Sequence, residues 1–281
     1  MNDAIVQPPP VLCPISGQAA QLAFSADILG RHSVRYYYCE ASGLLRTEPP
    51  YWLADAYTNA IASTDTGLVQ RNLGNASALE ALIERLGLAD GRILDVAGGY
   101  GLLARLLRDR GFDAYSTDTY CENLFAMHHE PQTNFQADLL LAFEVLEHIE
   151  DGLAFLADLF DRYGCRTLVF STTTFEGVVP PPEWWYYAFE TGQHISFYQP
   201  RTLQMLANRL GVRYLRLRSG LHLFTDQPLP PRFDWAERSG VLARWLAWQI
   251  RYRRRNLGLT LRDHEVSKAE LAQQVVRTTD S

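Results

Sequence analysis

Hydrophobic positions follow two different periods along the middle of the chain. Short apolar runs have the length of buried strands at residues 93–96, 114–117, 139–143 and 167–170. Leucines three and four positions apart predict helices over residues 102–107, 153–160 and 203–210, and two further strands are expected at residues 214–217 and 221–224. Strands separated by amphipathic helices predict an α/β fold with a mainly parallel sheet that is covered on both faces.

The two ends of the chain differ in pattern from this middle part. Proline clusters at residues 8–10 and 49–50 bracket an alternating run at residues 33–38, which predicts a small β-rich module. Apolar positions at helical spacing over residues 68–86 predict one or two helices that lead into the core. We therefore expect an N-terminal module over residues 1–55, a core over residues 56–228 and a basic helical segment over residues 229–281.

Composition narrows the classes of function. The 281 residues are 47% hydrophobic and carry a net charge of −6, so the chain can bury a sizeable core but has no overall positive field to gather nucleic acid. No uncharged apolar run reaches the length of a membrane span, and the N-terminus lacks the pattern of a secretory signal. The 4 cysteines are too scattered for a disulfide framework. These features predict a cytoplasmic enzyme with reduced thiols.

A glycine-rich turn carries the clearest chemical signal. Asp95 ends the first predicted core strand, a glycine-rich stretch at residues 98–101 follows, and Asp118 ends the next strand. At this edge of a sheet glycines let a nucleotide approach the backbone, and an acid on the next strand can accept hydrogen bonds from ribose hydroxyls. Residues 99–104 also satisfy the dinucleotide fingerprint, so NAD is an alternative ligand. The carboxylate of Asp95 would repel a pyrophosphate but attract an ammonium group, which favours S-adenosylmethionine.

Together with residues 143–149, this stretch resembles the class I S-adenosylmethionine-dependent methyltransferases, over residues 77–225. The resemblance implies a Rossmann-like core with a seven-stranded sheet, S-adenosylmethionine as methyl donor and S-adenosylhomocysteine as product. The family's first glycine is Ala97 here, a replacement that slightly narrows the loop and is tolerated if φ at this residue is negative. The implied cofactor-binding residues are Asp95, Ala97, Gly98, Gly99 and Gly101 at the methionine portion, Asp118 at the ribose, Thr119 near the adenine, and Phe143 and Glu144 on the cofactor floor.

A second set of residues resembles a narrower branch that includes nucleotide-sugar C-methyltransferases. The resemblance rests on residues 13–16, 39–42 and 180–198. It implies that His194 is the catalytic base or orients the acceptor, with His148 as the second candidate. Gln193 stands where the branch often has Glu, and an amide cannot raise the basicity of its neighbour as a carboxylate can.

The zinc-binding part of that branch is incomplete in this chain. The branch binds zinc through four N-terminal cysteines, whereas Ser16 and Ser42 occupy two of those positions here. Two thiols are too few for a structural zinc site, and serine hydroxyls are poor ligands. His32 as a third ligand is the alternative. We therefore expect no bound metal and a module that is held together by packing.

Two segments near the presumed methyl donor have more than one interpretation. The acids of residues 144–148 can simply begin a helix, where they offset its dipole, but a histidine there can also contact the acceptor and accept its proton. The aromatic residues 184–187 form either a hydrophobic cap or a wall against a sugar or ring.

The basic segment of residues 232–255 combines tryptophans and leucines with arginines. It can form a helix that docks by its apolar side, with solvated arginines near its C-terminal end. The alternatives use the charge: the arginines bind the diphosphate of a nucleotide-linked or lipid-linked sugar, or the helix makes a weak contact with an anionic membrane surface.

Taken together, the residues predict an S-adenosylmethionine-dependent methyltransferase with a small-molecule or carbohydrate-linked acceptor and no nucleic-acid partner. If the acceptor is a hydroxyl, His194 or His148 takes its proton. One alternative is an NAD-dependent oxidoreductase, which residues 99–104 favour. The other is a non-catalytic cofactor-binding homologue, which Ala97, Gln193 and the lost zinc ligands favour. Neither the acceptor nor the oligomeric state follows from these residues.

Overall fold

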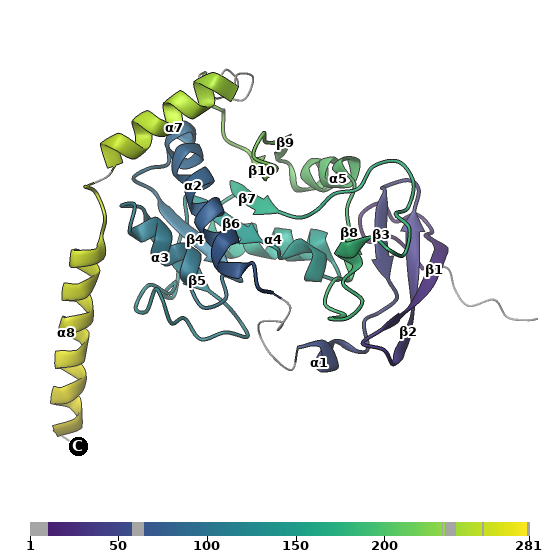
Figure 1. The fold of residues 1–281 in the computed structure, drawn as a ribbon, viewed down its shortest axis with the longest axis horizontal. Coiled ribbons are helices and arrows are strands. Elements are labelled where there is room, and N and C mark those ends of the chain that lie inside the picture. Colours follow the sequence, from purple (N-terminus) through teal and green to yellow (C-terminus); the bar gives the residue numbers. More distant parts are fainter. Residues whose placement is uncertain (1–10, 58–64, 232, 234–239, 255, 280–281) are drawn as a thin grey trace, which may run out of the picture.

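The computed structural model describes residues 11–57, 65–231, 233, 240–254 and 256–279, which form two sheets with helices around the larger one (Figure 1). The larger sheet has the strand order β5-β4-β6-β7-β10-β9. Its strands are β4 (Arg92–Val96), β5 (Asp113–Thr117), β6 (Leu139–Phe143), β7 (Leu168–Ser171), β9 (Arg213–Arg216) and β10 (His222–Thr225). All the core strands predicted from the sequence are therefore present, close to their expected bounds.

The strand directions confirm a mainly parallel sheet, but not the seven strands. β4 pairs parallel with β5 and β6, and β6 pairs parallel with β7. β10 runs antiparallel to both β7 and β9, so β9 points the same way as the parallel strands. The described part of the chain places six strands in this sheet, because residues 119–138 between β5 and β6 form turns and loops. Positive φ angles at His128 and Asn134 interrupt any extended backbone there.

Helices cover both faces of this sheet, as the pattern predicted. They are α2 (Leu68–Leu86), α3 (Leu102–Arg108), α4 (Gly152–Tyr163) and α5 (Pro200–Leu210). α2 and α3 share an apolar cluster with Ile93 and Leu139, whereas α4 and α5 share another with Leu94 and Leu140. Consecutive side chains of a strand point to opposite faces, so strands that are apolar throughout suit a sheet buried on both sides.

The second sheet is antiparallel and takes its strands from two distant parts of the chain. Its order is β1-β2-β3-β8, with β1 at Gln21–Ile28, β2 at His32–Cys39, β3 at Leu44–Thr47 and β8 at Ser196–Phe197. Leu45 of β3 pairs with Phe197 of β8. The remaining helices are short: α1 (Leu53–Ala56), η1 (Leu146–His148) and η2 (Trp185–Tyr187). The N-terminal sheet is thus completed by a strand from the middle of the chain.

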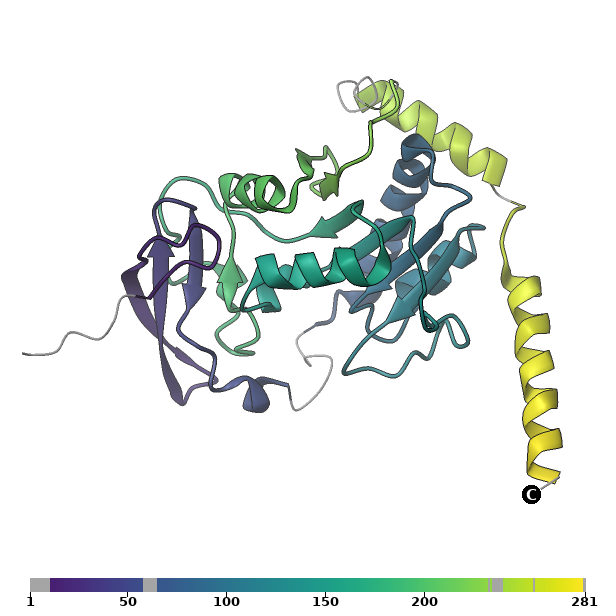
Figure 2. The ribbon, with the colours of Figure 1, turned by 180° about the vertical axis from the view of Figure 1, so that it is seen from behind.

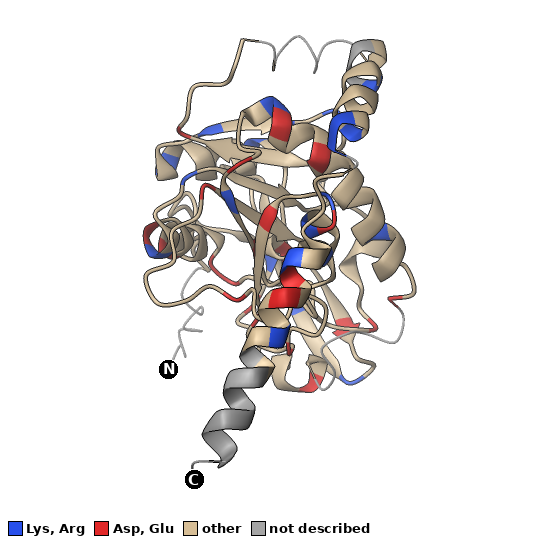
Figure 3. Cartoon of the chain, turned by 90° about the vertical axis from the view of Figure 1, so that its left-hand side faces the viewer, with Lys and Arg blue, Asp and Glu red and all other residues tan. Residues whose placement is uncertain are grey.

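Two helices end the described chain, α7 (Gly240–Arg254) and α8 (Thr260–Thr279). α7 lies across α2, whereas α8 runs beside the core and then projects from it (Figures 1 and 2). α8 carries basic and acidic residues close together rather than one sign of charge (Figure 3). None of the described helices is both apolar enough and long enough to span a bilayer.

The expectation of solvated arginines on α7 is wrong for Arg254. This residue is buried, donates a hydrogen bond to Glu84 Oε1 at 2.7 Å, and places its guanidinium carbon 3.8 Å from the ring centroid of Phe112. Of the apolar residues expected on the docked side, Ile250 is buried but Trp245 is exposed, as is the neighbouring Trp248. Both the buried Arg254 and the buried Ile250 therefore attach this helix to the core, while part of its apolar surface faces outward. The sequence expectations for Arg232, Trp235, Arg238 and Arg255 concern residues outside the described ranges.

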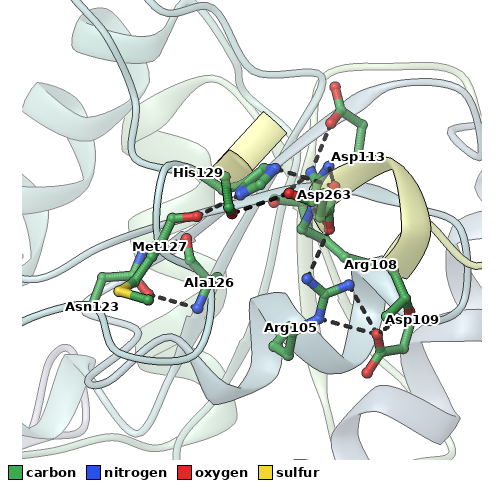
Figure 4. A network of polar contacts seen from close by, with 12 residues as sticks. Arg105, Arg108, Asp109, Asp113, Asn123, Ala126, Met127, His129 and Asp263 are labelled. Carbon is green, nitrogen blue, oxygen red and sulfur yellow. Dashed lines mark hydrogen bonds and ion pairs between the residues drawn. The ribbon is translucent and has the colours of Figure 1, made fainter. Parts of the chain in front are cut away.

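One carboxylate fixes the start of α8 to the core. Asp263 accepts hydrogen bonds from Arg105 and Arg108, at 2.7 Å from each, and His129 Nε2 lies 3.3 Å from it (Figure 4). Desolvation opposes its ionisation, but the hydrogen bonds from the two guanidiniums prevail and lower the pKa of Asp263 to about 2.

Asp263→Asn is expected to lower the free energy of unfolding by about 2 kcal/mol at pH 7, because the buried Arg108 loses most of its compensating charge. The folded pKa lies below the unfolded value of about 3.9, so this stabilisation is present above pH 4 and is lost as the pH falls toward 2. Urea unfolding at pH 7 and pH 3 measures both effects. The control Asp158→Asn breaks an exposed pair with Arg162 and should cost less than about 0.5 kcal/mol. Equal losses in the two variants at pH 7 would contradict the prediction.

Candidate active site

The turn between β4 and α3 leaves backbone uncovered at the edge where β4 and β5 end. Gly99 has a φ of +59° and Gly101 a φ of +81°, conformations that other residues seldom adopt. The position that a Cβ of Gly101 would take is filled by Asn123, whereas the space beside Gly99 is open. A ligand can therefore reach the backbone of the turn at Gly99.

The acid at the end of β5 is oriented by this turn. Asp118 Oδ2 accepts a hydrogen bond from the backbone N–H of Gly99 at 2.9 Å. Its Oδ1 accepts bonds from the backbone N–H groups of Tyr120 and Cys121, at 2.7 and 2.9 Å. Thr119, beside it, is exposed. The structure thus brings Asp118 and the glycine turn together, with Thr119 at the open side.

Asp95 lies behind the turn and is only 2% exposed. Among the described residues, none donates a hydrogen bond to its carboxylate. Desolvation, and next the charge of Asp118, raise the pKa of Asp95 to about 8. The hydroxyl of Ser116, which also lies against Gly98, is buried and likewise lacks a partner in the described ranges. Buried polar groups are costly to leave unpaired, so this corner suits a ligand that carries a cation and hydrogen-bond donors.

The negative φ under which Ala97 would be tolerated without strain is not found. Its φ is +53°, in the left-handed region, where the Cβ of an L-residue crowds the following carbonyl. Such strain costs roughly 1–2 kcal/mol and persists where the surroundings hold the backbone in place. The alanine therefore does not narrow the turn by choosing another conformation; it keeps the backbone path that a glycine would take.

Ala97→Gly is expected to raise the free energy of unfolding by about 0.5 kcal/mol. Relief of the left-handed strain exceeds the extra chain entropy that glycine gives the unfolded state. Urea unfolding provides the measurement. Ala41→Gly is the control, because Ala41 is exposed and does not have a positive φ, so there glycine should lower stability. A loss of stability in both variants would show that Ala97 is not strained.

The end of β6 lies at the same edge of the sheet. Phe143 is partly buried, and Glu144 has a φ of +53°. The hydroxyl of Ser171 donates a hydrogen bond to Glu144 Oε1 at 2.5 Å and accepts one from the Glu144 backbone N–H at 3.0 Å. These two bonds tie the ends of β6 and β7 together and fix the strained residue. Glu144 is thus held at the strand end by β7.

Next to this strand end, one acid and two histidines converge. Glu147, His148 and His194 each place one potential ligand atom within 4.8 Å of the others. Residues 146–148 form only the single turn η1, and α4 begins later, with Asp151 as its N-cap. The interpretation of Glu147 as the start of a helix is therefore wrong.

Backbone contacts bring His194 to this cluster. Ile195, Ser196 and Tyr198 each donate a hydrogen bond to a backbone carbonyl of residues 146–149, at 2.7 to 3.0 Å. The two imidazole rings meet edge to face, with centroids 4.9 Å apart. The loop before β8 is thus laid along η1, and the two predicted catalytic histidines become neighbours.

Backbone carbonyls set the tautomer of both rings. His148 Nδ1 lies 3.0 Å from the carbonyl oxygen of Gln193, and His194 Nδ1 lies 2.7 Å from that of Tyr186. Because a carbonyl can only accept, each Nδ1 carries the proton and, in the neutral ring, each Nε2 presents a lone pair. Desolvation, and next His194, lower the pKa of His148 to about 3, so this ring is neutral at pH 7.

Glu147 is the buried member of the cluster. The hydroxyl of Tyr186 donates a hydrogen bond to its Oε1 at 2.6 Å. Its Oε2 is buried and has no hydrogen-bond partner among the described residues. Desolvation raises the pKa of Glu147. One oxygen of this buried carboxylate therefore has no hydrogen-bond partner among the described residues, and the residue lies in the same cluster as the two histidines.

Tyr57, after α1, contributes a side chain that no sequence motif indicated. Its hydroxyl lies 3.0 Å from His148 Nδ1, and its ring stacks on that of Tyr120 with centroids 5.4 Å apart. Tyr120 in turn lies two residues after Asp118. Tyr57 therefore connects the edge of the sheet at Asp118 with the two histidines.

The four positions that resemble a zinc site do come together. Cys13 Sγ lies 3.2 Å from Ser42 Oγ, and Cys39 Sγ lies 3.2 Å from Ser16 Oγ. His32 does not join them, because its Nε2 lies 3.0 Å from a carboxylate oxygen of Asp55. The four side chains are thus paired by thiol–hydroxyl hydrogen bonds.

The aromatic run after β7 serves mainly as a cap. Tyr186 and Tyr187 are buried in a cluster with Tyr36 and Trp52 beneath the N-terminal sheet. Trp185, by contrast, is 72% exposed. Packing explains most of this run, and the Tyr186 hydroxyl adds the contact with Glu147.

Comparisons with known proteins identify the family of this chain. Residues 70–217, more than half of the chain, match the family described as methyltransferase domain. No curated protein matches the sequence. Similar solved structures include magnesium protoporphyrin IX methyltransferase from Synechocystis PCC 6803 with bound SAH, at 15% identity and a TM-score of 0.40 over 63% of this chain and 96% of that one. Human N-acetylserotonin methyltransferase in complex with SAM has 16% identity and a TM-score of 0.39 over 63% of this chain and 66% of its own.

TnmH has 18% identity and a TM-score of 0.45, and the match covers 62% of this chain and 60% of TnmH. The chain thus spans less than two thirds of two of these three structures and nearly all of the other. The family match, which rests on the sequence over the whole of the larger sheet except β10, decides the assignment. This chain belongs to the methyltransferase-domain family.

Proposed function

We propose that this chain is a cytoplasmic S-adenosylmethionine-dependent methyltransferase that acts on a small-molecule or carbohydrate-linked acceptor. The observation that carries the proposal is the pair of acids around the glycine turn. Asp95 is buried without a partner in the described chain, and Asp118 is oriented by Gly99. With a pKa of about 8, Asp95 can ionise to pair with a ligand ammonium, whereas beside a pyrophosphate it would have to stay protonated, and this difference favours S-adenosylmethionine over NAD.

The side chains at this edge fit the cofactor. Asp95 accepts the ammonium of the methionine portion, directly or through water, and Asp118 accepts the ribose hydroxyls. Open space beside Gly99 leaves room for the ligand. Thr119 lies near the adenine, and the remaining residues of the proposed site are Ala97, Gly98 and Gly101 in the turn and Phe143 and Glu144 on the floor. The cofactor supplies an electrophilic methyl group on a sulfonium.

The protein's part in the reaction is to position the acceptor and to exclude water, because methyl transfer is an in-line displacement. His194 is the first candidate to orient the acceptor and, where the acceptor is a hydroxyl, to take its proton; His148 is the second. The proximity of both rings to Glu144 at the cofactor floor supports this assignment. Tyr57 and the cap formed by residues 184–187 wall the same region.

Calorimetric titration with S-adenosylhomocysteine, and with NAD in parallel, tests the proposal. Saturable micromolar binding of S-adenosylhomocysteine without an NAD signal is the expected result, and NAD binding alone would overturn it. Transfer of a radiolabelled methyl group to a panel of hydroxylated small molecules and sugar nucleotides then tests turnover. Binding of S-adenosylhomocysteine without transfer to any member of a broad panel would favour the non-catalytic homologue.

A further inference from the structure

We propose that Glu147, His148 and His194 form a binding site for a divalent transition-metal ion such as Mn²⁺ or Co²⁺. The two histidines and one carboxylate come from two segments of the chain, η1 and the loop before β8. This site is separate from the Cys13 and Cys39 positions, where the sequence had raised the question of a metal. The proposal stands on the ligand set, on the tautomers of the rings and on an unpartnered buried oxygen.

The ligand set is of a type that binds such ions. Neutral imidazole nitrogens and a carboxylate oxygen suit Mn²⁺, Fe²⁺, Co²⁺ and Zn²⁺, and two histidines with one carboxylate leave positions open for water or substrate. The three potential ligand atoms already lie within 4.8 Å of one another. An ion about 2.1 Å from each ligand would need them roughly 3 Å apart, which shifts of about 1 Å achieve.

The rings are prepared for this role by their backbone partners. Metal-ligating histidines typically donate their other N–H group to a carbonyl or carboxylate, which fixes the ring and its tautomer. His148 donates from Nδ1 to the carbonyl of Gln193, and His194 donates from Nδ1 to that of Tyr186. The lone pair of each Nε2 is thereby left for a ligand.

Glu147 supplies the independent observation. Its side chain is fully buried, and its Oε2 has no hydrogen-bond partner in the described chain, while Oε1 is held by Tyr186. An unpaired carboxylate oxygen in such a position is costly, and protein interiors normally supply it with a donor or a cation. A divalent ion between this oxygen and the two Nε2 atoms would satisfy all three groups at once.

The ion would define the acceptor more closely, and this step rests on the proposed function. An ion with open positions beside the methyl donor favours an acceptor whose hydroxyl oxygen can bind to it, because the charge lowers the pKa of that hydroxyl. With both Nε2 lone pairs on the ion, the histidines orient the acceptor through the ion and do not take its proton themselves. The acceptor O–H bond breaks and its proton passes to water. The freed oxygen lone pair forms the bond to the methyl carbon, and the electron pair of the C–S bond stays on sulfur. The products are a methyl ether and neutral S-adenosylhomocysteine.

Titration of the chelator-treated full chain with Co²⁺ tests the site directly, by calorimetry and by the visible absorption of the bound ion. We expect one equivalent bound, with a loss of affinity of about 100-fold or more in Glu147→Gln and in His194→Asn. Glu147→Gln keeps an acceptor for Tyr186, so the packing is retained. Two controls should bind Co²⁺ as the wild type does. The first is His32→Asn, which removes a histidine that pairs with Asp55 away from the site. The second is the double variant Cys13→Ser, Cys39→Ser.

Titration of each variant with S-adenosylhomocysteine separates the two proposals and reports on the fold. If Glu147→Gln and His194→Asn bind S-adenosylhomocysteine normally but Co²⁺ poorly, the metal site stands. The metal site is overturned if the wild type binds S-adenosylhomocysteine but no Co²⁺ at millimolar concentration. It is also overturned if Glu147→Gln and His194→Asn bind Co²⁺ as tightly as the wild type, or if only the cysteine variant loses Co²⁺ binding. If the chain binds Co²⁺ through Glu147 and His194 but does not bind S-adenosylhomocysteine, the proposed function is overturned and the metal site stands.

Discussion

Asp95→Asn should weaken the binding of S-adenosylhomocysteine by about 100-fold. A hydrogen bond between a buried carboxylate and an ammonium is worth up to roughly 3 kcal/mol, and the neutral amide cannot replace its charge. Asn has nearly the same shape, so the glycine turn packed against residue 95 should be retained. Calorimetry at pH 8, where the wild-type carboxyl is substantially ionised, gives the largest difference between the two proteins.

The matched control for this variant is Asp90→Asn. Asp90 is exposed in the turn before β4. Its replacement by Asn removes a carboxylate close to Asp95 in sequence but outside the proposed site. Its affinity for S-adenosylhomocysteine should stay within about twofold of the wild type, because exposed charges at a distance are screened. Wild-type affinity in Asp95→Asn would mean that the ligand's ammonium binds elsewhere.

The second large effect is the pH dependence of S-adenosylhomocysteine binding. The affinity for S-adenosylhomocysteine should rise about tenfold per pH unit between pH 6 and pH 8 and then level off. Asp95 has a pKa of about 8 in the free protein, so below that pH it must lose a proton before its carboxylate can pair with the ammonium. Each binding event therefore releases a proton in this range, and the released protons make binding tighter as the pH rises. Calorimetry in two buffers with different ionisation enthalpies counts them.

Asp95→Asn again provides the comparison, since it cannot release this proton. Its weak affinity should be nearly constant between pH 6 and pH 8. A wild-type affinity that is flat over this range would show that Asp95 is already ionised before the ligand arrives.

The elements of the core could be predicted because each depends on side chains that are close in sequence. Residues 139–143 are apolar throughout, and this strand lies in the centre of a sheet covered on both faces. The seventh strand, by contrast, was expected only from the resemblance. Residues 119–138 contain no run of strand pattern, and the structure has turns and loops there. Ala97 was judged by what alanine prefers, whereas the surrounding turn imposes a positive φ.

The two parts of the candidate site also differ in how far the sequence predicts them. The meeting of Asp95, the glycine turn and Asp118 at one edge of the sheet could be predicted because these residues follow one another through two strands and one helix. The other part depends on contacts between distant segments: Tyr57 reaches His148, and Tyr186 reaches Glu147. A motif of a few residues cannot predict contacts with segments that are distant in sequence. Glu147 therefore resembled a helix start until its burial and its neighbours were known.

The pairing of β3 with β8 has a consequence for the order in which the protein can form. Leu45 leaves the ribosome about 150 residues before its partner Phe197, and closing so long a loop is slow. Until then the N-terminal hairpin presents the edge of β3 with unpaired backbone groups, and exposed edges of this kind pair readily with other chains. The interval between the synthesis of β3 and of β8 is thus when a nascent chain is most open to aggregation, and when a chaperone would be of most use to it.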